Sequence, residues 1–215
     1  MLRNLLRSAV FSLAVFTALS SFAGPAVLIE EDGVPIKPLS GRSTLKETYS
    51  GQEFGNSYDL REKRRVGVGI QMSGLSGLYG IFAELNVNPS NSGVIGFGGG
   101  PGYSSFYGNW KYLFSENRFS PYIGLGYAHW YDATGAKDGL AQTNPKFLTS
   151  KFLNSLEKET GRFQIDLLTA SAGLQYHVLS GPYVGFSFFT EIDLLVRTIN
   201  LAVAPTGTVG SIYYF

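Results

Sequence analysis

The two histidines of the chain, His129 and His177, are the residues best suited to acid–base chemistry. A serine hydroxyl that attacks an ester needs such a base, and the base needs an acid that orients it. No serine, histidine and acid stand in a recognisable catalytic pattern, so we expect no catalytic residue. The chain has no cysteine, which excludes thiolate nucleophiles, disulfides and cysteine-based metal sites. We therefore expect neither a cofactor nor a metal.

A glycine run, Gly98-Gly99-Gly100-Pro101-Gly102, invites comparison with a phosphate-binding loop. It lacks the Lys-Ser/Thr pair that grips phosphate, and no helical pattern follows it. In a narrow, curved sheet, glycines permit bending and leave room for large side chains from other strands. We interpret the run in that way.

Five polar residues lie in stretches where apolar residues recur at every second place, and each occupies one of the positions between the apolar residues. They are Gln71, Glu84, Lys111, Gln175 and Glu191. Successive side chains of a strand point to opposite faces, so these five face away from the apolar ones. A charge in a closed interior needs a partner, and we expect Lys111 to pair with Glu84 or Glu191. The network is either a static plug, which we prefer, or a gate whose ion pair exchanges partners.

Eight runs with this period of two follow one another from Arg65 to the C-terminus. They cover 66–72, 79–87, 95–103, 106–114, 121–131, 168–178, 184–196 and 202–215. Most are near the length of about 9–11 residues that a tilted strand needs to cross a membrane.

The composition is unusual for a soluble protein, with 27 Gly, 13 Tyr and 16 Phe but only 15% charged residues. The mean hydropathy is +0.06. In a transmembrane barrel only alternate residues face lipid, so the mean stays near zero. We predict an all-β fold: a transmembrane antiparallel up-and-down β-barrel of about eight strands. A secreted β-sandwich is the alternative.

Three segments are predicted along the chain. Residues 1–23 read as a signal peptide, with Arg3 and Arg7, a short apolar run and small residues before a cleavage point after Ala23. Residues 24–64 form an irregular N-terminal extension in the periplasm, with a short helix near 57–63. Residues 65–215 form the barrel. The 17 Lys and Arg, two of them in the signal peptide, nearly balance the 16 Asp and Glu, which gives no reason to expect nucleic acid as a partner.

The connections after even-numbered runs are short, whereas those after the fifth and seventh are longer. Transmembrane barrels have short periplasmic turns and long external loops, so the loop from Asp132 to Arg162 is predicted to be external. It contains a helix signal. The residues of this signal are Asn144 as cap, Pro145, Leu148, Phe152, Leu153 and Leu156 along one face, and Gly161 as terminator.

Two stretches and the C-terminus resemble a known family. The stretches 109–114 and 120–127 are similar to the fourth and fifth strands of small eight-stranded outer-membrane proteins, such as the transmembrane part of outer-membrane protein A. The end of the chain, with Tyr213 and Phe215 at alternate positions, resembles the C-terminal signature that the barrel-assembly machinery reads in that family. Ser211 departs from the pattern because it places a polar residue on the outward face.

The resemblance implies a bacterial outer-membrane protein in contact with lipid, including lipopolysaccharide. Members serve as structural proteins, adhesins or solute channels, so we expect a role in envelope structure or in binding through external loops, with an unidentified partner. A channel for small or hydrophobic solutes is the alternative, and a lipid A-modifying enzyme is a weaker one. Against the enzyme, His177 falls near the periplasmic end, and His129 has lipid-facing parity at the external rim, where amphipathic rings gather.

The C-terminal signature leads to a first prediction. Replacing Phe215 with Asp should lower the amount of barrel that reaches the membrane, because the assembly machinery would no longer bind the tail. The measurement is the yield of heat-modifiable protein in membrane fractions. A normal yield would contradict a signalling role for Phe215.

Overall fold

The computed structural model describes residues 53–133 and 145–215. The predicted signal peptide, most of the predicted extension and the cap Asn144 lie outside the described residues. No helix within these two ranges is both long enough and apolar enough to cross a membrane.

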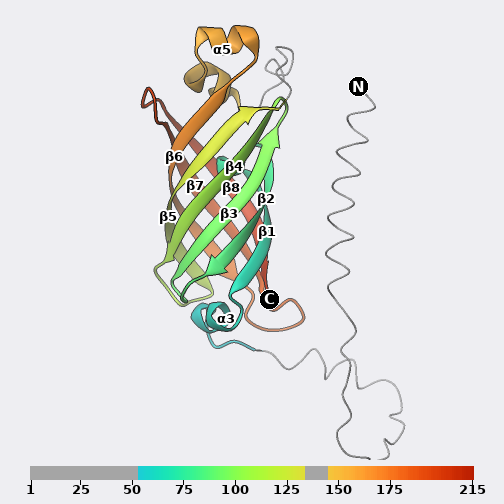
Figure 1. Cartoon of the computed structure of the whole chain (residues 1–215). Coiled ribbons are helices and arrows are strands. Elements are labelled where there is room, and N and C mark those ends of the chain that lie inside the picture. Colours follow the sequence, from blue (N-terminus) through green and yellow to red (C-terminus); the bar gives the residue numbers. More distant parts are fainter. Residues whose placement is uncertain (1–52, 134–144) are drawn as a thin grey trace, which may run out of the picture. The chain divides into compact units, whose positions relative to one another are not determined.

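The described residues form antiparallel strands that close into one barrel in sequence order, with β1 paired to β8 (Figure 1). The strands are β1 (Val66–Ser73), β2 (Tyr79–Asn86), β3 (Asn91–Gly100), β4 (Tyr103–Leu113), β5 (Phe119–Asp132), β6 (Gln164–His177), β7 (Phe186–Arg197) and β8 (Val203–Tyr214). This confirms the predicted eight-stranded up-and-down barrel.

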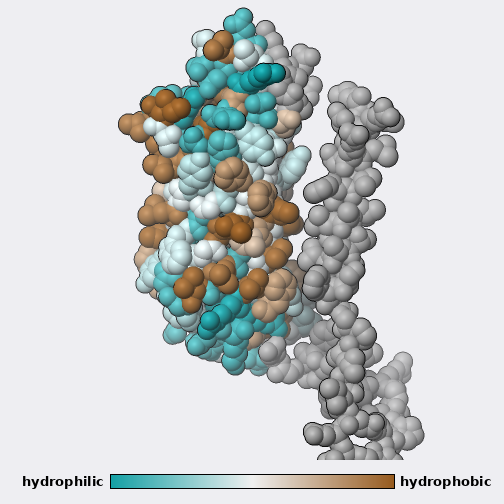
Figure 2. Space-filling view, in the orientation of Figure 1, coloured by the Kyte–Doolittle hydropathy of each residue, from teal (hydrophilic) through white to brown (hydrophobic). Residues whose placement is uncertain are grey.

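The residues that alternate along each strand lie on the two faces of the barrel wall, one outside and one inside. Large apolar side chains are exposed on the outside, and the middle of the wall is largely apolar, with hydrophilic residues gathered toward both ends (Figure 2). Polar, aromatic and aliphatic side chains fill the inside. A wall that is apolar outside and polar inside is the reverse of a soluble barrel and suits a lipid surround.

Several strands begin a few residues from the predicted positions, such as β3 at Asn91 instead of 95 and β6 at Gln164 instead of 168. The boundary between β3 and β4 has a clear cause. Tyr103 begins β4 instead of ending the third run, because Pro101 and Gly102, which has φ of 84°, form a tight turn. The ring of Tyr103 points into the barrel and stacks on Trp130 at 5.2 Å. Alternation could not be read there because the preceding residues are glycines.

The predicted ordering of connection lengths is also wrong in one place. The connection after β7 spans only residues 198–202, whereas the one after β6 spans residues 178–185. Gly181 and Gly185 have φ of 86° and 100°, so the chain leaves the extended conformation although its apolar residues still alternate. Only the β5–β6 connection is long.

The helix predicted in that long connection is divided in two. The π-helical turn η2 (Leu148–Phe152) and the helix α5 (Ser155–Thr160) are separated because Asn154 begins a new helix. Its side chain accepts from the backbone N–H of Glu157 at 2.8 Å, and the Glu157 carboxylate accepts from the N–H of Asn154 at 2.7 Å. Gly161 ends α5 in the left-handed conformation, as expected.

Helix α3 (Ser57–Lys63), expected from the sequence, closes the end of the barrel that also holds the C-terminus, called here the α3 end (Figure 1). The backbone N–H of Phe54 donates to the carbonyl of Leu179 at 2.9 Å, and that of Ser57 to Glu116 at 2.8 Å. Leu60 and Arg61 of the helix are buried. The helix therefore lies across the mouth and is bound to two different connections.

The opposite end, called the α5 end, is closed by apolar packing. Leu148, Phe152 and Leu153 are buried over Trp130. Below them the turn η1 (Gly74–Ser76), which joins β1 to β2, bends inward, and the Trp130 indole donates to the carbonyl of Leu75 at 3.0 Å. The lumen is thus filled from both ends.

The filled lumen predicts which glycines can be replaced. A Cβ on Gly96 would lie 2.3 Å from the Tyr107 ring inside the barrel, whereas a Cβ on Gly93 meets nothing within 4 Å. Gly96→Val should lower the free energy of unfolding by about 1–3 kcal/mol, since overpacking forces neighbours to shift. Urea unfolding in micelles measures this, with Gly93→Val as the matched control. Equal stability of the two variants would contradict a packed lumen.

Candidate functional site: the charged lumen

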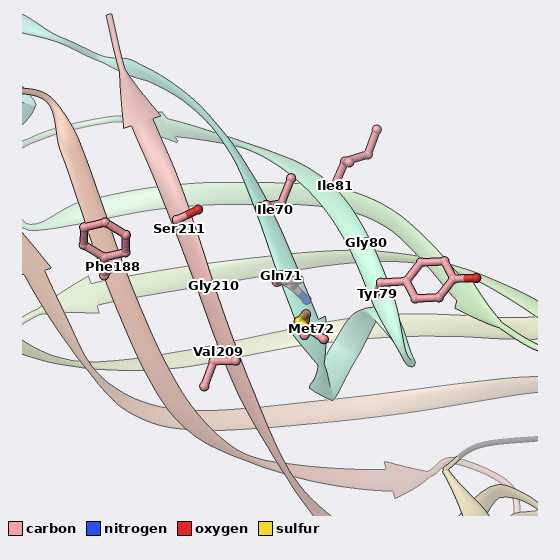
Figure 3. Close-up of a pocket in the computed structure, with 10 residues that line it drawn as sticks. All are labelled: Ile70, Gln71, Met72, Tyr79, Gly80, Ile81, Phe188, Val209, Gly210 and Ser211. Carbon is pink, nitrogen blue, oxygen red and sulfur yellow. The ribbon is translucent and has the colours of Figure 1, made fainter. Parts of the chain in front are cut away.

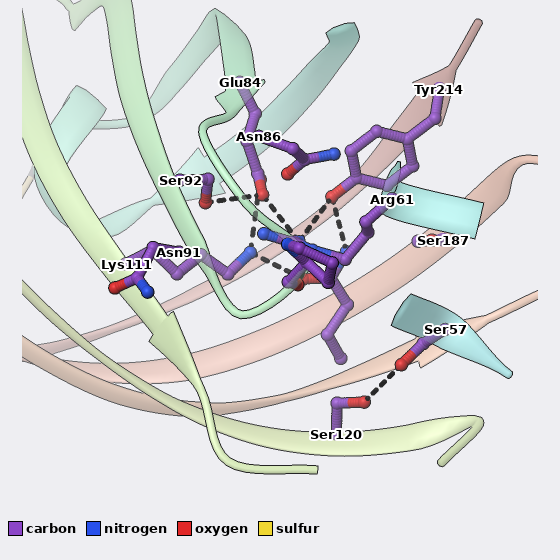
Figure 4. A network of polar contacts seen from close by, with 12 residues as sticks. Ser57, Arg61, Glu84, Asn86, Asn91, Ser92, Lys111, Ser120, Ser187 and Tyr214 are labelled. Atoms are coloured by element: carbon purple, nitrogen blue, oxygen red, sulfur yellow. Dashed lines mark hydrogen bonds and ion pairs between the residues drawn. The ribbon is translucent and has the colours of Figure 1, made fainter. Parts of the chain in front are cut away.

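Glu84, on β2, is the centre of the polar network at the α3 end, and its carboxylate is buried. One oxygen accepts from Arg61 Nη1 at 2.8 Å and from Ser92 Oγ at 2.8 Å, and the other accepts from Lys111 Nζ at 3.2 Å (Figure 4). A carboxylate with three donors, two of them charged, is well compensated for its removal from water.

Lys111, on β4, connects Glu84 to the far wall of the barrel. Its ammonium donates to Gln175 Oε1 at 2.5 Å and lies 4.3 Å from the centre of the Tyr122 ring. The Gln175 amide donates to the Tyr214 hydroxyl at 3.0 Å. That hydroxyl also accepts from Arg61 Nη1 at 3.3 Å, so the contacts form a closed ring of side chains.

Of the five polar residues singled out in the sequence, the structure joins Glu84, Lys111 and Gln175 directly. Glu191 is placed differently, because its carboxylate accepts from the Tyr122 hydroxyl at 2.8 Å. Gln71 is buried with its amide nitrogen unpartnered. Gln71, Glu84, Lys111 and Glu191 do line one cavity of about 20 Å³, which is room for about one water molecule.

Three members of the network were missed by the sequence reading. Ser92 lies before the third run as predicted, in the connection expected after the second run. Tyr214 carried a signal, since it lies on the opposite face from Tyr213 and Phe215. Arg61 carried none, because it belongs to a helix outside the strand pattern and reaches the lumen only through the docking of α3. Asp193 has the lumen parity that the sequence predicts, and its carboxylate accepts from the Thr208 hydroxyl.

The two histidines lie in unrelated places. His129 faces outward near the α5 end, where its Nδ1 lies 2.7 Å from Asp166 Oδ1 and the Tyr127 hydroxyl donates to the same oxygen. Its ring packs against Phe106 at 5.1 Å. This outward orientation agrees with an aromatic belt, and Asp166 is the partner that sequence reading missed.

His177 lies inside the α3 end, fully buried, with Nδ1 2.9 Å from Ser187 Oγ. Among the described residues, no acidic side chain is hydrogen-bonded to this pair. Across the described ranges, no three His, Cys, Asp or Glu side chains gather as they would around a metal ion. Neither histidine therefore belongs to a serine–histidine–acid arrangement.

The two residues of the expected assembly signal lie on the outside at the α3 end. The rings of Tyr213 and Phe215 are 5.6 Å apart, and Tyr213 also packs on Phe186 at 4.9 Å. The backbone N–H of Phe215 donates to the carbonyl of Val66 at 3.0 Å, so the last residue joins the first strand.

The closed barrel, its apolar outer wall and its lumen filled with side chains define a small transmembrane β-barrel. No protein-family model matches the chain, and no curated protein sequence does. Among solved structures, the chain is similar to the N-terminal β-barrel domain of Pseudomonas aeruginosa OprF, with 16% identity, a TM-score of 0.47, and coverage of 69% of this chain and 97% of that one. It is also similar to the Yersinia pestis outer membrane protein Ail, with 13% identity, a TM-score of 0.40, and coverage of 71% and 99%. Neither likeness bears on the role of this chain.

The geometry around Glu84 predicts that substitutions of its two cationic partners have strongly non-additive effects on the free energy of unfolding. Arg61→Met or Lys111→Met alone leaves one cation on Glu84, so each should destabilise the barrel moderately. The double variant leaves a buried carboxylate without a cation, and its loss should exceed the sum of the two single losses by about 0.5–3 kcal/mol. The free energy of unfolding in urea measures the effect.

Glu84→Gln is the control for these single and double substitutions. Added to the double variant, it should recover part of the loss, because a neutral amide is less costly to bury than a carboxylate. Simple additivity of the two Met substitutions, or no recovery when Glu84→Gln is added, would show that Glu84 is not held by both cations.

Proposed function

We propose that this protein is an integral barrel of the bacterial outer membrane that serves in envelope structure and does not conduct solutes. In this proposal the α3 end faces the periplasm and the α5 end faces outward, as the long β5–β6 connection favours. Its partners are membrane lipid, including lipopolysaccharide, and the barrel-assembly machinery during biogenesis. Binding through the outward connections remains a prediction.

One observation carries the proposal: the lumen is occupied along its length. Arg61, Glu84 and Lys111 block the α3 end with mutually bonded charges, and Leu75, Trp130 and Phe152 block the α5 end. An eight-stranded barrel is just wide enough for side chains to fill, so such a filling leaves no continuous aqueous path.

The two alternatives are less well supported. A gated channel would need the bonds of Glu84 to both cations to break together, and such buried pairs are costly to separate. A lipid-modifying enzyme would need a nucleophile beside His129, and the described residues give that imidazole an acidic partner, Asp166, but no hydrogen-bonded hydroxyl nucleophile. His177 and Ser187 are buried where no substrate reaches them.

Planar-bilayer recording tests the sealed lumen. The purified protein should produce no stepwise conductance, because the ring of side chains around Glu84 closes the pore. The control for detecting an opened barrel removes side chains at both blocked ends, Arg61→Ala and Lys111→Ala in that ring together with Trp130→Ala at the α5 end. Stable conductance steps from the unaltered protein would contradict the proposal.

A further inference from the structure

The barrel wall is much lower on one side than on the other. Strands β1 and β2 have 8 residues each, whereas β5 and β6 have 14 each. At about 3.3 Å per residue and a tilt of about 45°, 8 residues rise about 19 Å and 14 residues about 33 Å. A tilted strand needs about 9–11 residues to cross the hydrocarbon core of a bilayer, so β1 and β2 are shorter than such a strand.

Because β1 is short, the upper part of β8 loses its partner on one side. The pairing of β1 with β8 ends at Ser73 and Thr208, while β8 continues to Val203 and is paired there with β7 alone. The bond from Phe215 N–H to Val66 sets which residues of β8 point toward β1. By the alternation of an antiparallel ladder, the odd-numbered residues do so.

The residues that face this gap are Val203 and Pro205, defined here as the open edge. Proline has no N–H, and it is found in sheets at edges that lack a partner strand. At the open edge, the carbonyl of Val203 accepts from Lys151 Nζ at 3.4 Å. Unpaired backbone groups are not tolerated in hydrocarbon, so water or lipid headgroups must reach this level.

Directly below the open edge, the lipid-facing wall has a hollow of about 560 Å³ (Figure 3). Its floor is β8, where Ser211 stands opposite Ile70 on one side and Phe188 on the other. Small outward residues on β8 between larger ones on β7, β1 and β2 create the hollow. Met72, Val209 and Tyr79 form the part of the hollow that is nearest to the α5 end, next to the gap.

We propose that the hollow and the open edge together bind one phosphate-bearing membrane lipid, with an acyl chain in the hollow and the headgroup at the edge. The hollow is continuous with the lipid-facing wall and its side chains are apolar, which suits hydrocarbon. The Lys151 ammonium, which donates to the carbonyl of Val203, supplies positive charge for a phosphate at the edge. The site rests on the proposed membrane insertion but not on a sealed lumen.

Native mass spectrometry with added phosphatidylglycerol tests the binding. The unaltered protein should retain one lipid after detergent exchange, and Ser211→Phe, which fills the hollow, should lower the retained fraction at least tenfold. The matched control is Ala172→Phe, on the lipid-facing side of β6, which should retain the lipid as the unaltered protein does. Lys151→Gln should weaken binding of phosphatidylglycerol more than that of phosphatidylcholine.

Three results would overturn the proposal: no retained lipid, equal retention by Ser211→Phe, or a dimer that Ser211→Phe abolishes. The last would assign the hollow to a second copy of the chain.

Cysteine labelling tests separately whether water reaches the open edge. The chain has no cysteine of its own, so a single introduced cysteine can be labelled. In proteoliposomes, Pro205→Cys should react with a membrane-impermeant maleimide, whereas Leu125→Cys, on the outward face of the taller β5, should not. Heat-modifiable migration verifies folding of both variants. An unreactive Pro205→Cys in a folded barrel would show that the open edge is covered, and would overturn the site even if the protein proved non-conducting.

Discussion

The carboxylate of Glu84 is the group on which the interior arrangement depends. It is buried in a barrel too narrow for bulk water, so its charge must be matched by side chains. The match comes from β4 through Lys111 and from α3 through Arg61, and Gln175 and Tyr214 extend the contacts to β6 and β8. Through these contacts, one buried charge connects helix α3 to four strands of the barrel, β2, β4, β6 and β8.

The same helix also joins the two ends of the barrel sequence. Arg64, just after α3, donates to the carbonyls of Val184 and Tyr214 at 3.0 Å each. Phe215 is meanwhile bonded to Val66 across the seam between the last and first strands. The docking site of α3 therefore exists in full only when β1 and β8 are paired, which makes the plug a consequence of closure as well as a support for it.

The two mouths are closed by different physical means, and the wall between them is uneven. Charges and hydrogen bonds close the α3 end, whereas Trp130, Phe152 and their neighbours close the α5 end by apolar contact. The short β1–β2 hairpin turns inward at η1 and fills the lumen instead of raising the wall. Filling the interior and leaving an open edge on β8 are therefore two results of one short hairpin.

The sequence by itself determined the eight strands, their inward and outward faces and helix α3, because a period of two is a local property of the chain. It also placed Glu84, Lys111 and Gln175 on one side of the wall. Only the tertiary structure decided that Lys111 bonds to Glu84 and not directly to Glu191, that Arg61 joins them, and that Asp166 meets His129. These contacts depend on the stagger between strands and on the docking of a separate helix. Both are set by closure of the whole barrel, which no local pattern records.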